Sequence, residues 1–379
     1  MKTPDAAAGT PPEFAAWMRL AIALAKRAEG DTHPNPIVGA LIVEDGKIVA
    51  EGWHRRAGTP HAERAALAAL GRPPHAGATL VVTLEPCSTH GRTGACTDAI
   101  LAAGGIARVV VGAVDPNPAH AGRGLEILRA AGIDVVSGVL ADECARLNPI
   151  FNWQIVKKTP LFAAKIAMTL DGRTATRAGE SQWLTGPAAR EDVMRLRRAF
   201  PAIATGAGTV LADNPSLTAR VPGEAVRCGT RFVFDRRLRT LGQLGDLKIF
   251  NDEFRANTVL VTTRAVPAGL AAQLASRGVR VLNLAGAEGD FWKKFRAYCS
   301  ENGICGVLFE AGAELLGGLL AARELNYIYA YVAPKIFGDP AARPAFAGTP
   351  LAHLADAFAL APLHATPFPP DIRLEAEFS

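Results

Sequence analysis

The sequence lacks the features that mark secreted and membrane-spanning proteins. Its six cysteines, in a chain of 379 residues, have no regular spacing and do not form the disulfide framework of a small secreted domain. No apolar run approaches the length of a membrane span, and Met1–Pro12, rich in Pro, Ala and Gly, lacks the apolar core of a signal peptide. We therefore expect a cytoplasmic protein with no membrane partner.

Excess charge and aromatic residues are also scarce. The formal net charge of +5 is spread over the whole chain and falls short of the dense basic stripe of a nucleic-acid binder. Aromatic residues make up 7% of the chain and are not interleaved with basic clusters. A modest positive charge suits anionic small molecules, so we predict a small-molecule ligand and no nucleic-acid partner.

A Rossmann dinucleotide site is not indicated either, because no Gly-x-Gly-x-x-Gly follows a strand with an acidic residue downstream. Gly206-x-Gly208 is only a fragment of that pattern. The run from Gly312 to Gly318 is a stronger candidate, because it follows an expected strand and opens an expected helix. Backbone N–H groups at such a helix N-terminus could hold a cofactor phosphate.

The chain is long enough, and at 49% hydrophobic and 20% charged residues apolar enough, for two globular domains. Lys157–Pro160 is the expected linker. We predict a tail over residues 1–13, a first domain over 14–156 and a second over 159–379. A homo-oligomer is expected, for which the apolar strand Tyr327–Val332 could pair between chains.

Both halves alternate strands and helices, which predicts two α/β domains with parallel strand pairs. In the first half, helices are expected over Glu13–Glu29, His61–Leu70, Asp98–Ala103 and Leu125–Ala131, and strands over Ala40–Val43, Lys47–Gly52, Thr79–Leu84, Arg108–Val114 and Ile133–Val136. In the second half, helices are expected over Pro187–Phe200, Leu270–Ser276 and Phe291–Cys299, and strands over Leu161–Ala167, Ala202–Thr205, Phe232–Asp235, Thr258–Thr262, Val279–Leu284, Gly306–Glu310 and Tyr327–Val332, the last closing the core.

Two half-motifs in the first domain predict a zinc site. His61-Ala62-Glu63 and the later pair Cys87 and Cys96 offer one imidazole, two thiols and one carboxylate. Three ligands with an open fourth position are typical of a catalytic zinc, and His-x-Glu followed by Pro-Cys and a further Cys is typical of nucleobase deaminases. A closed structural zinc would need a fourth ligand, for which His54, His75 and His90 are candidates.

Each half-motif alone is more often a surface helix or a pair of small buried residues. His61 and Glu63 are two residues apart, so in mid-helix they would point in different directions. They can serve one site only at the first turn of a helix, and Pro60 favours such a start. Cys87 is expected at the carboxyl end of a strand, where open α/β sheets bind ligands.

The motifs of both halves resemble, in order, those of the bifunctional riboflavin-biosynthesis deaminase–reductases. In the first half they are Pro34-Asn35-Pro36-x-Val38-Gly39, His61-Ala62-Glu63, Glu85-Pro86-Cys87-Ser88-x-His90-Gly91-Arg92-Thr93 with Cys96, and Asp115-Pro116-Asn117-Pro118 with Gly122-Arg123-Gly124. In the second half they are Lys165-x-Ala167-x-Thr169-Leu170-Asp171-Gly172-Arg173, Gly179-Glu180-Ser181-Gln182-Trp183, Thr209-Val210-Leu211-Ala212-Asp213-Asn214-Pro215-x-Leu217-Thr218 and Glu310-Ala311-Gly312.

This resemblance implies a cytidine-deaminase-like first domain and a dihydrofolate-reductase-like second domain. It implies zinc-dependent deamination of a phosphorylated diaminopyrimidinone ribotide, followed by NADPH-dependent reduction of its ribosyl group to a ribityl chain. The implied zinc ligands are His61, Cys87 and Cys96, and Glu63 is the implied catalytic proton shuttle. The implied substrate contacts of the deaminase are Asn35, Ser88, Arg92, Asp115 and Asn117.

For the reductase, the resemblance implies NADPH contacts from Ala167, Trp183, Thr209, Asp213, Gly312, Ala313, Glu314, Leu315, Leu316, Gly317 and Gly318. It implies substrate contacts from Lys165, Ser181, Arg197, Leu217, Arg220 and Glu310, with the two Arg meeting the phosphate. The acid–base group stays open between Lys165, Asp213 and Glu310. The neighbouring Arg190, Arg195 and Arg198 are expected on a solvated helix face.

The chain departs from the family pattern at three places. Thr89 stands where relatives commonly have His, Gly94-Ala95 replaces the usual Pro-Pro before the second Cys, and Arg236 stands where relatives often have Ser near the cofactor. Three other interpretations remain: a nucleic-acid-editing deaminase with an RNA-binding second domain, a metal-stabilised binding module without catalysis, and a chain with only one active domain.

The zinc prediction is testable by metal analysis. Replacing Cys96 by Ala removes one of three predicted ligands, so we expect Cys96→Ala protein to lose most of its zinc when measured by elemental analysis. Cys228→Ala, which removes a thiol outside the motif, is the matched control and should keep the metal. A Cys96→Ala protein with a full complement of zinc would contradict the ligand assignment.

Overall fold

The computed structural model describes residues 11–89, 94–118, 120–286, 288–348 and 350–379. Two compact units divide the chain between Thr159 and Pro160. The first helix, α1 (Pro12–Lys26), begins before the predicted domain start at Phe14. Arg92 and His90 lie outside the described residues, so their predicted roles have no structural description here.

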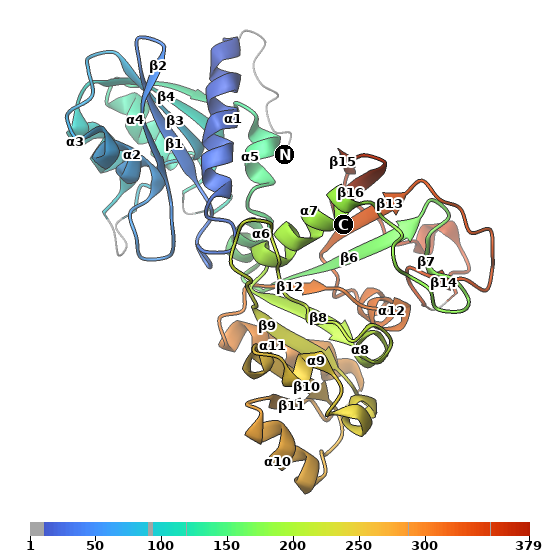
Figure 1. The fold of residues 1–379 in the computed structure, drawn as a ribbon. Coiled ribbons are helices and arrows are strands. Elements are labelled where there is room, and N and C mark those ends of the chain that lie inside the picture. The colour runs from blue at the N-terminus through green and yellow to red at the C-terminus, as the bar shows by residue number, and fades with distance from the viewer. Residues whose placement is uncertain (1–10, 90–93, 119, 287, 349) are drawn as a thin grey trace. The chain divides into compact units, whose positions relative to one another are not determined.

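The first unit is built on a five-stranded sheet in the order β2-β1-β3-β4-β5 (Figure 1). β1 pairs antiparallel with β2 and β3, whereas β3, β4 and β5 are parallel. Every residue of β1 and β3 is buried, because helices cover both faces of the sheet. The strands are β1 (Gly39–Glu44), β2 (Lys47–Trp53), β3 (Ala78–Leu84), β4 (Ile106–Ala113) and β5 (Asp134–Ser137).

Two glycines show which helix covers which face of this sheet. A Cβ on Gly39 would overlap the carbonyl oxygen of Ala21 in α1, and a Cβ on Gly52 would overlap the backbone of α2 (Ala62–Leu70). Gly52 pairs directly with Ala40, the neighbour of Gly39, so the two glycines face opposite sides of the pleat. α1 and α2 therefore pack on opposite faces at close range.

The other helices of this unit are α3 (Cys96–Ala103), α4 (Arg123–Ala130), α5 (Ala141–Ala145) and α6 (Pro149–Lys157). The two last were not predicted, and α6 occupies the segment before the expected linker. The predicted end of α2 is confirmed, because Gly71 adopts the left-handed conformation with φ 68°.

The second unit contains a nine-stranded sheet in the order β11-β10-β9-β8-β12-β6-β13-β16-β15. β12 inserts between β8 and β6, so the strand order reverses at this point and the carboxyl ends of these three parallel strands adjoin. The parallel strands are β6 (Leu161–Thr169), β8 (Ala202–Gly206), β9 (Thr230–Phe234), β10 (Thr258–Thr262), β11 (Arg280–Asn283), β12 (Gly306–Phe309) and β13 (Tyr327–Ala333).

The helices of the second unit that matter below are α7 (Pro187–Ala199), α8 (Ala207–Asp213) and α12 (Ala313–Ala321). Its other α-helices are α9 (Lys248–Asn251), α10 (Ala268–Ser276) and α11 (Phe291–Glu301), and β7 (Arg173–Ala175) pairs with β14 (Arg343–Pro344). A core of aromatic rings from β6, β9, β12 and α11 packs on one face of the sheet, with Phe162, Phe232, Phe295 and Phe309 fully buried.

The C-terminal strands correct the prediction that Tyr327–Val332 closes the core. β15 (His364–Phe368) and β16 (Asp371–Glu377) continue the sheet beyond β13 as an antiparallel pair. β13 therefore bonds to β6 on one side and to β16 on the other. Its edges are occupied, so the suggestion that this strand pairs between chains is wrong.

The side chain of Arg198 also corrects a prediction. It is 9% exposed and forms an ion pair with Glu224, so it does not belong to a solvated face of α7. Arg195 is solvent-exposed as expected and pairs with Glu191 one turn earlier. The arginines of α7 therefore differ in role although they are close in sequence.

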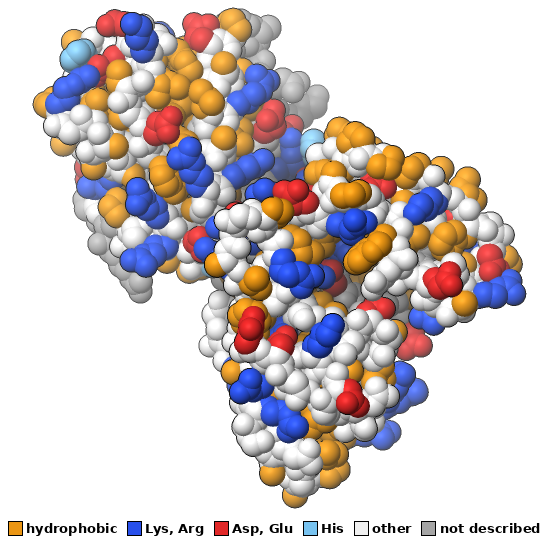
Figure 2. Space-filling model, viewed as in Figure 1, with side chains coloured by type: hydrophobic (Ala, Val, Ile, Leu, Met, Phe, Trp, Pro, Cys, Tyr) orange, Lys and Arg blue, Asp and Glu red, His pale blue; other side chains and the backbone are white. Residues whose placement is uncertain are grey.

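The distribution of charged side chains on the surface agrees with the expectation of no dense basic stripe. On the face seen in Figure 2, Lys and Arg side chains are interspersed with acidic and apolar ones and do not form a single stripe. Among the residues that the structure describes, no helix combines the length and the apolar character needed to cross a bilayer.

Two neighbouring glycines of α12 give a test of this fold. A Cβ on Gly317 would overlap the carbonyl oxygen of Ala347, whereas nothing lies within 4 Å of a Cβ on Gly318. We expect Gly317→Ala to lower the free energy of unfolding by about 1–3 kcal/mol through overpacking. Gly318→Ala, the matched control, should raise it by about 0.5–1 kcal/mol because Ala favours a helix interior. Urea denaturation measures both, and equal effects would contradict the packing.

Candidate functional site

The three predicted zinc ligands meet at one point of the first unit. His61 is the residue before α2, Cys87 follows β3 and Cys96 opens α3. Nδ1 of His61 lies 3.5 Å from Sγ of Cys87 and 3.3 Å from Sγ of Cys96. The three ligand atoms all lie within 4.8 Å of one another, which is a spacing that one metal ion can bridge.

Local structure explains why these residues converge. His61 and Glu63 lie at the first turn of α2, as the spacing predicts, so both point out of the end of the helix. The carbonyl oxygen of Cys87 accepts hydrogen bonds from the N–H groups of Cys96 (3.0 Å) and Thr97 (3.2 Å). These bonds satisfy the first amides of α3 and tie the two thiol segments together.

The donor set fits zinc. A hydrogen bond from the thiol of Cys96, together with His61, lowers the pKa of Cys87 to about 4, so this thiol ionises readily. The pKa of Cys96 is raised, because its thiol holds the proton of that bond and is buried. One soft thiolate, a second thiol and an imidazole are the ligand types that select zinc.

No fourth protein ligand completes the cluster among the described residues. His54 stacks edge-on near His61 with ring centroids 5.4 Å apart, but its Nδ1 lies 3.1 Å from the carbonyl oxygen of Pro60 and its Nε2 lies 3.2 Å from Nδ2 of Asn35. His75 pairs with Glu44 at 3.2 Å. Within the described part of the chain, the arrangement is thus a three-ligand site.

Glu63 is the carboxylate beside this cluster. Its side chain is almost fully buried, and burial raises its pKa to about 7, although the neighbouring His61 opposes this shift. A carboxyl group whose pKa lies near neutrality can both accept and donate a proton within one reaction cycle. Glu63 is therefore placed and tuned for proton transfer next to the three ligands.

A pocket of about 480 Å³ opens onto the ligands. Of the predicted substrate contacts, Asn35, Asp115 and Asn117 line it, and Ser88 does not. The Oγ atom of Ser88 is buried without a hydrogen-bond partner among the described residues. Thr89 and His120 also line the pocket, with Oγ1 and Nε2 3.5 Å apart.

A buried carboxylate, Glu85, shapes one wall of this pocket. Its Oε2 accepts hydrogen bonds from the N–H groups of Asp115 (3.1 Å) and Gly122 (2.9 Å), and its Oε1 accepts one from Gly124 (2.8 Å). A Cβ on Gly124 would overlap the carbonyl oxygen of Pro86, so only glycine permits this approach. Glu85 therefore fixes the loop that carries Asp115 and Asn117.

The sequence analysis did not assign a role to Glu85 or His120, and it considered His54 only as a fourth ligand of a structural zinc. Only one feature of the sequence pointed to a role for Glu85, namely its position directly after an apolar strand. An acidic residue that is buried there needs hydrogen-bond partners. The partners are backbone amides 30 to 39 residues further on, and no side-chain pattern reveals them.

In the second unit, three predicted residues form one largely buried ionic cluster. Arg197 of α7 donates to both carboxylate oxygens of Glu310, with Nε–Oε1 at 2.6 Å and Nη2–Oε2 at 3.0 Å. Nζ of Lys165, in β6, lies 3.5 Å from Oε2 of Glu310. Burial would raise the pKa of Glu310, but the charges of Arg197 and Lys165 hold it at about 2. Burial lowers the pKa of Lys165, and Glu310 opposes that shift.

Arg197 also reaches the loop that carries the predicted residues Leu217 and Arg220. Its Nη1 donates to the carbonyl oxygen of Thr218 at 3.1 Å, and Nη1 of Arg220 donates to Oγ1 of Thr218 at 2.8 Å. Leu217 has φ 51°, a left-handed conformation that is uncommon outside glycine, and it is buried. The loop therefore holds its shape through contacts on both sides of Leu217.

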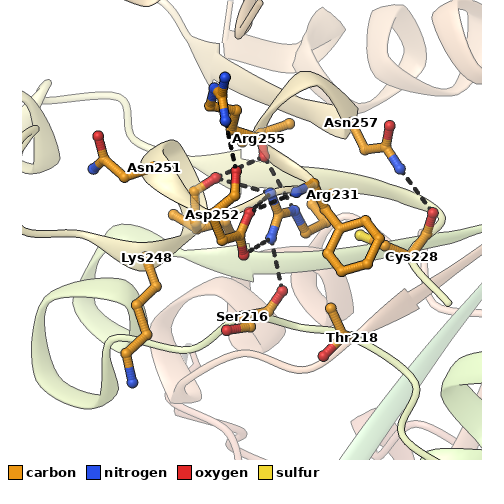
Figure 3. Close-up of polar contacts among 12 residues, drawn as sticks. Ser216, Thr218, Cys228, Arg231, Lys248, Asn251, Asp252, Arg255 and Asn257 are labelled. Atoms are coloured by element: carbon orange, nitrogen blue, oxygen red, sulfur yellow. Dashed lines mark hydrogen bonds and ion pairs between the residues drawn. The ribbon is translucent and has the colours of Figure 1, made fainter. Parts of the chain in front are cut away.

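Figure 3 shows the contacts on the other side of this loop. Arg231 is fully buried and forms a bidentate ion pair with Asp252, with nitrogen–oxygen distances of 2.7 and 2.8 Å. It also donates to the carbonyl oxygens of Ser216 (2.9 Å) and Ile249 (3.0 Å) and to Oγ1 of Thr258 (3.1 Å). All five guanidinium N–H groups thus have acceptors, as a buried arginine requires.

The predicted cofactor residues gather around the carboxyl ends of β6, β8 and β12. Thr209 of α8 lies near Gly312, since a Cβ on Gly312 would be 3.9 Å from its Oγ1. Ala167 shares a face of β6 with Lys165. Burial raises the pKa of Asp213, at the end of α8, and Arg343 opposes the shift.

The remaining cofactor candidates divide into exposed and buried ones. Trp183 is 65% exposed, and the guanidinium of Arg190 lies 4.7 Å from its ring centroid. Lys335 donates to the carbonyl oxygen of Trp183 at 3.0 Å and so holds the loop of Ser181 and Trp183. The residues of the Gly-rich run lie as follows: Gly312, Ala313, Glu314 and Leu315 form the start of α12, Leu316 and Gly317 are buried inside it, and Gly318 is exposed.

Comparisons with known proteins match both units. The family described as "RibD C-terminal domain" matches residues 160–374, and the one described as "Cytidine and deoxycytidylate deaminase zinc-binding region" matches residues 13–113. The chain is 41% identical over 340 residues to "Riboflavin biosynthesis protein RibD" of Actinobacillus pleuropneumoniae, covering 88% of this chain and 86% of that protein. It is 41% identical over 336 residues to the Escherichia coli K12 protein of the same name, covering 86% and 89%.

Solved structures are similar over the same extent. RibD of Acinetobacter baumannii is 35% identical with a TM-score of 0.74, covering 97% of this chain and 99% of that one. A Thermotoga maritima protein is 33% identical, also with a TM-score of 0.74 and with coverage of 97% and 99%. Its description is a diaminohydroxyphosphoribosylaminopyrimidine deaminase and 5-amino-6-(5-phosphoribosylamino)uracil reductase.

The buried carboxylate of Glu85 gives a test of the pocket wall. Glu85→Gln leaves one oxygen for three N–H donors and places an amide N–H against them. We expect it to lower the free energy of unfolding by about 2–4 kcal/mol and to speed amide hydrogen exchange at Gly122 and Gly124. Glu51→Gln, on an exposed position of β2, is the control and should change neither quantity. Unchanged exchange at both glycines would contradict the role of Glu85.

Proposed function

The chain belongs to the RibD family of bifunctional riboflavin-biosynthesis proteins, and on this premise we propose that its units perform consecutive steps on one pyrimidine ribotide. It is a bifunctional enzyme with a deaminase and a reductase unit. The predicted fold class, α/β with a cytidine-deaminase-like first domain and a dihydrofolate-reductase-like second domain, is confirmed. The observation that carries the proposal is the His61, Cys87 and Cys96 cluster beside Glu63.

We take the substrates to be those in the description of the Thermotoga relative. The first unit would deaminate the diaminohydroxypyrimidine that carries a phosphoribosylamino group. The second would reduce the resulting 5-amino-6-(5-phosphoribosylamino)uracil to its ribityl form with NADPH. The order of the two steps follows from the chemistry. Deamination produces a uracil ring, and the reductase substrate in that description is a uracil.

In the deaminase unit, His61, Cys87 and Cys96 would hold zinc. When bound, zinc lowers the pKa of a water toward neutrality and so supplies the nucleophile. Glu63 would accept one proton from the attacking water and pass it to the ring nitrogen, and would then carry the second proton, from the hydroxyl group that the attack creates, to the departing ammonia. Its burial favours this cycle, because burial raises the pKa of Glu63 to about 7, where a carboxyl group can both accept and donate a proton at neutral pH.

The pocket residues would bind the rest of the ribotide. The contact between Nδ2 of Asn35 and the ring of His54 leaves the amide oxygen of Asn35 to accept from the base or sugar. Asp115 and Asn117 face the same pocket from the loop that Glu85 holds. Ser88 does not line this pocket, so its substrate contact is proposed from the family pattern alone. Arg92 is proposed from the family pattern alone as a phosphate contact, because it lies outside the described residues.

In the reductase unit, NADPH would lie along the carboxyl ends of β6, β8 and β12. It supplies the hydride for the sugar carbon bonded to nitrogen. The N–H groups of Gly312, Ala313 and Glu314, at the start of α12, have no intrahelical acceptor by position and would receive a cofactor phosphate. Ala167, Trp183, Thr209 and Asp213 would line the rest of this site, while Leu316, Gly317 and Gly318 support the helix.

We further propose an order among the candidate acid–base groups. Glu310 is held ionised by Arg197 and Lys165, so it is a poor proton donor. The lowered pKa of Lys165 makes its ammonium the better acid, and we assign it the proton that the sugar ring oxygen takes up on opening. Asp213 carries no contact with this cluster among the described residues and would act on the cofactor side.

The proposed substrate phosphate site centres on Arg220. Its side chain is exposed and its Nη1 donates to Thr218, whereas three donors of Arg197 already serve Glu310 and Thr218. Arg197 would therefore act mainly by orienting Glu310. Ser181 and Leu217 would complete the site from their loops. A homo-oligomer and a cytoplasmic location, which keeps thiols reduced, remain predictions.

Product analysis with two single-site variants tests the assignment. Full-length protein with the diaminopyrimidinone ribotide should give the deaminated product without NADPH and the ribityl product with it, as seen by mass spectrometry. Glu63→Gln should lower deamination by about 100-fold or more and leave reduction of the supplied deaminated ribotide unchanged. Lys165→Met should lower the reduction and leave the deamination unchanged.

Each variant thus serves as the matched control for the other. Loss of both activities in either variant would indicate misfolding or dependence between the sites. If wild-type protein loaded with zinc forms neither product, the proposal fails. If Lys165→Met reduces its substrate at the wild-type rate, the assignment of the proton donor is wrong while the reductase assignment stands.

A further inference from the structure

Arg64 links the two helices that carry the proposed zinc ligands. It lies in the first turn of α2, directly after Glu63, and its Nη2 donates a 3.0 Å hydrogen bond to the carbonyl oxygen of Ala95. Ala95 is the residue immediately before α3, whose first residue is the ligand Cys96. One side chain of the His61 helix is therefore bonded to the backbone that sets the position of Cys96.

The segment before Cys96 has little stiffness of its own. Gly94 contributes no side chain, and Ala95 stands at the N-cap position of α3 without a side chain that could accept a bond from the helix. Arg64 covers the place of the missing side chain, because a Cβ on Gly94 would lie 3.0 Å from its Nη2. The guanidinium thus packs on Gly94 and bonds to Ala95 at once.

We propose that Arg64 is a positioning residue for the zinc site, one that holds Gly94-Ala95 so that Cys96 stays at ligand distance from His61. It acts in concert with the bonds from Cys96 and Thr97 to the carbonyl of Cys87, which join the two thiol segments to each other but not to α2. Arg64 supplies the missing connection, between α2, which His61 precedes, and the segment that leads to Cys96. The inference rests on the proposed zinc centre and goes beyond it, because no ligand role is assigned to Arg64.

The physical reason is the cost of ordering the ligands. A metal binds tightly when its ligands are already placed, and outer groups that orient ligands change metal affinity by about 10- to 100-fold when removed. A glycine-containing segment without a clamp samples more conformations, so metal binding must restrict them. Removing the clamp should therefore weaken zinc binding while leaving all three ligand atoms in the chain.

The test measures zinc affinity of the full-length protein by competition with a chromophoric chelator. Arg64→Met keeps the aliphatic stem and removes the donors, and we expect zinc binding to be about 10-fold weaker. Arg64→Lys keeps the charge and a single donor and should recover part of the loss. Arg19→Met, which removes an exposed charge on α1, is the control and should bind zinc like wild type.

Two further readouts separate positioning from general stability. The absorption spectrum of the cobalt-substituted protein should change in Arg64→Met, because the thiolate geometry relaxes, and the melting temperature of the metal-free protein should not. Wild-type zinc affinity in Arg64→Met would overturn the proposal. The proposal would also be overturned if Arg64→Met lowered the melting temperature of the metal-free protein along with its zinc affinity. An equal loss of zinc affinity in Arg19→Met, or an Arg64→Lys protein that binds zinc no better than Arg64→Met, would have the same consequence. If wild-type protein binds no zinc, it is the proposed function that fails.

Discussion

Charge buried at the ends of strands is the constraint on which both units depend. A carboxylate or guanidinium removed from water must be paired or fully hydrogen-bonded, or the fold loses several kcal/mol. In the first unit Glu85 meets this demand with three backbone amides, and the loop of Asp115 and Asn117 is ordered as a result. In the second unit Arg231 and Glu310 meet it with side chains and carbonyls around the loop of Leu217.

The two units use this constraint differently. Beside the three-ligand cluster, burial raises the pKa of Glu63 to about 7, and the charge of His61 only partly opposes that rise. At the reductase cluster, two cations keep Glu310 ionised although its side chain is only 9% exposed. The same residue type is therefore suited to carry a proton in one unit and is held as an anion in the other, and its neighbours decide which.

The features that could be predicted from the sequence are those that depend on a local residue pattern. His61, Glu63, Cys87 and Cys96 are recognisable because a helix start and a strand end place them by their own neighbours in the chain, and most buried strands follow from apolar runs. The sequence pattern missed β15 and β16, whose alternation is weak, and it placed Arg198 in solvent because an ion pair with Glu224 leaves no periodic trace. The cited bonds of Glu85 and Arg64 join residues 39 and 31 positions apart and depend on tertiary structure alone.

The division at Thr159 and Pro160 places two complete cores on a single polypeptide. Every translation event therefore yields one copy of each unit, and the ratio of the two active sites is fixed at synthesis. Changes in expression scale both steps together and cannot correct an imbalance between them. Any build-up of the compound passed from the first step to the second is then governed by the relative turnover of the two sites, which only substitutions within one unit can adjust.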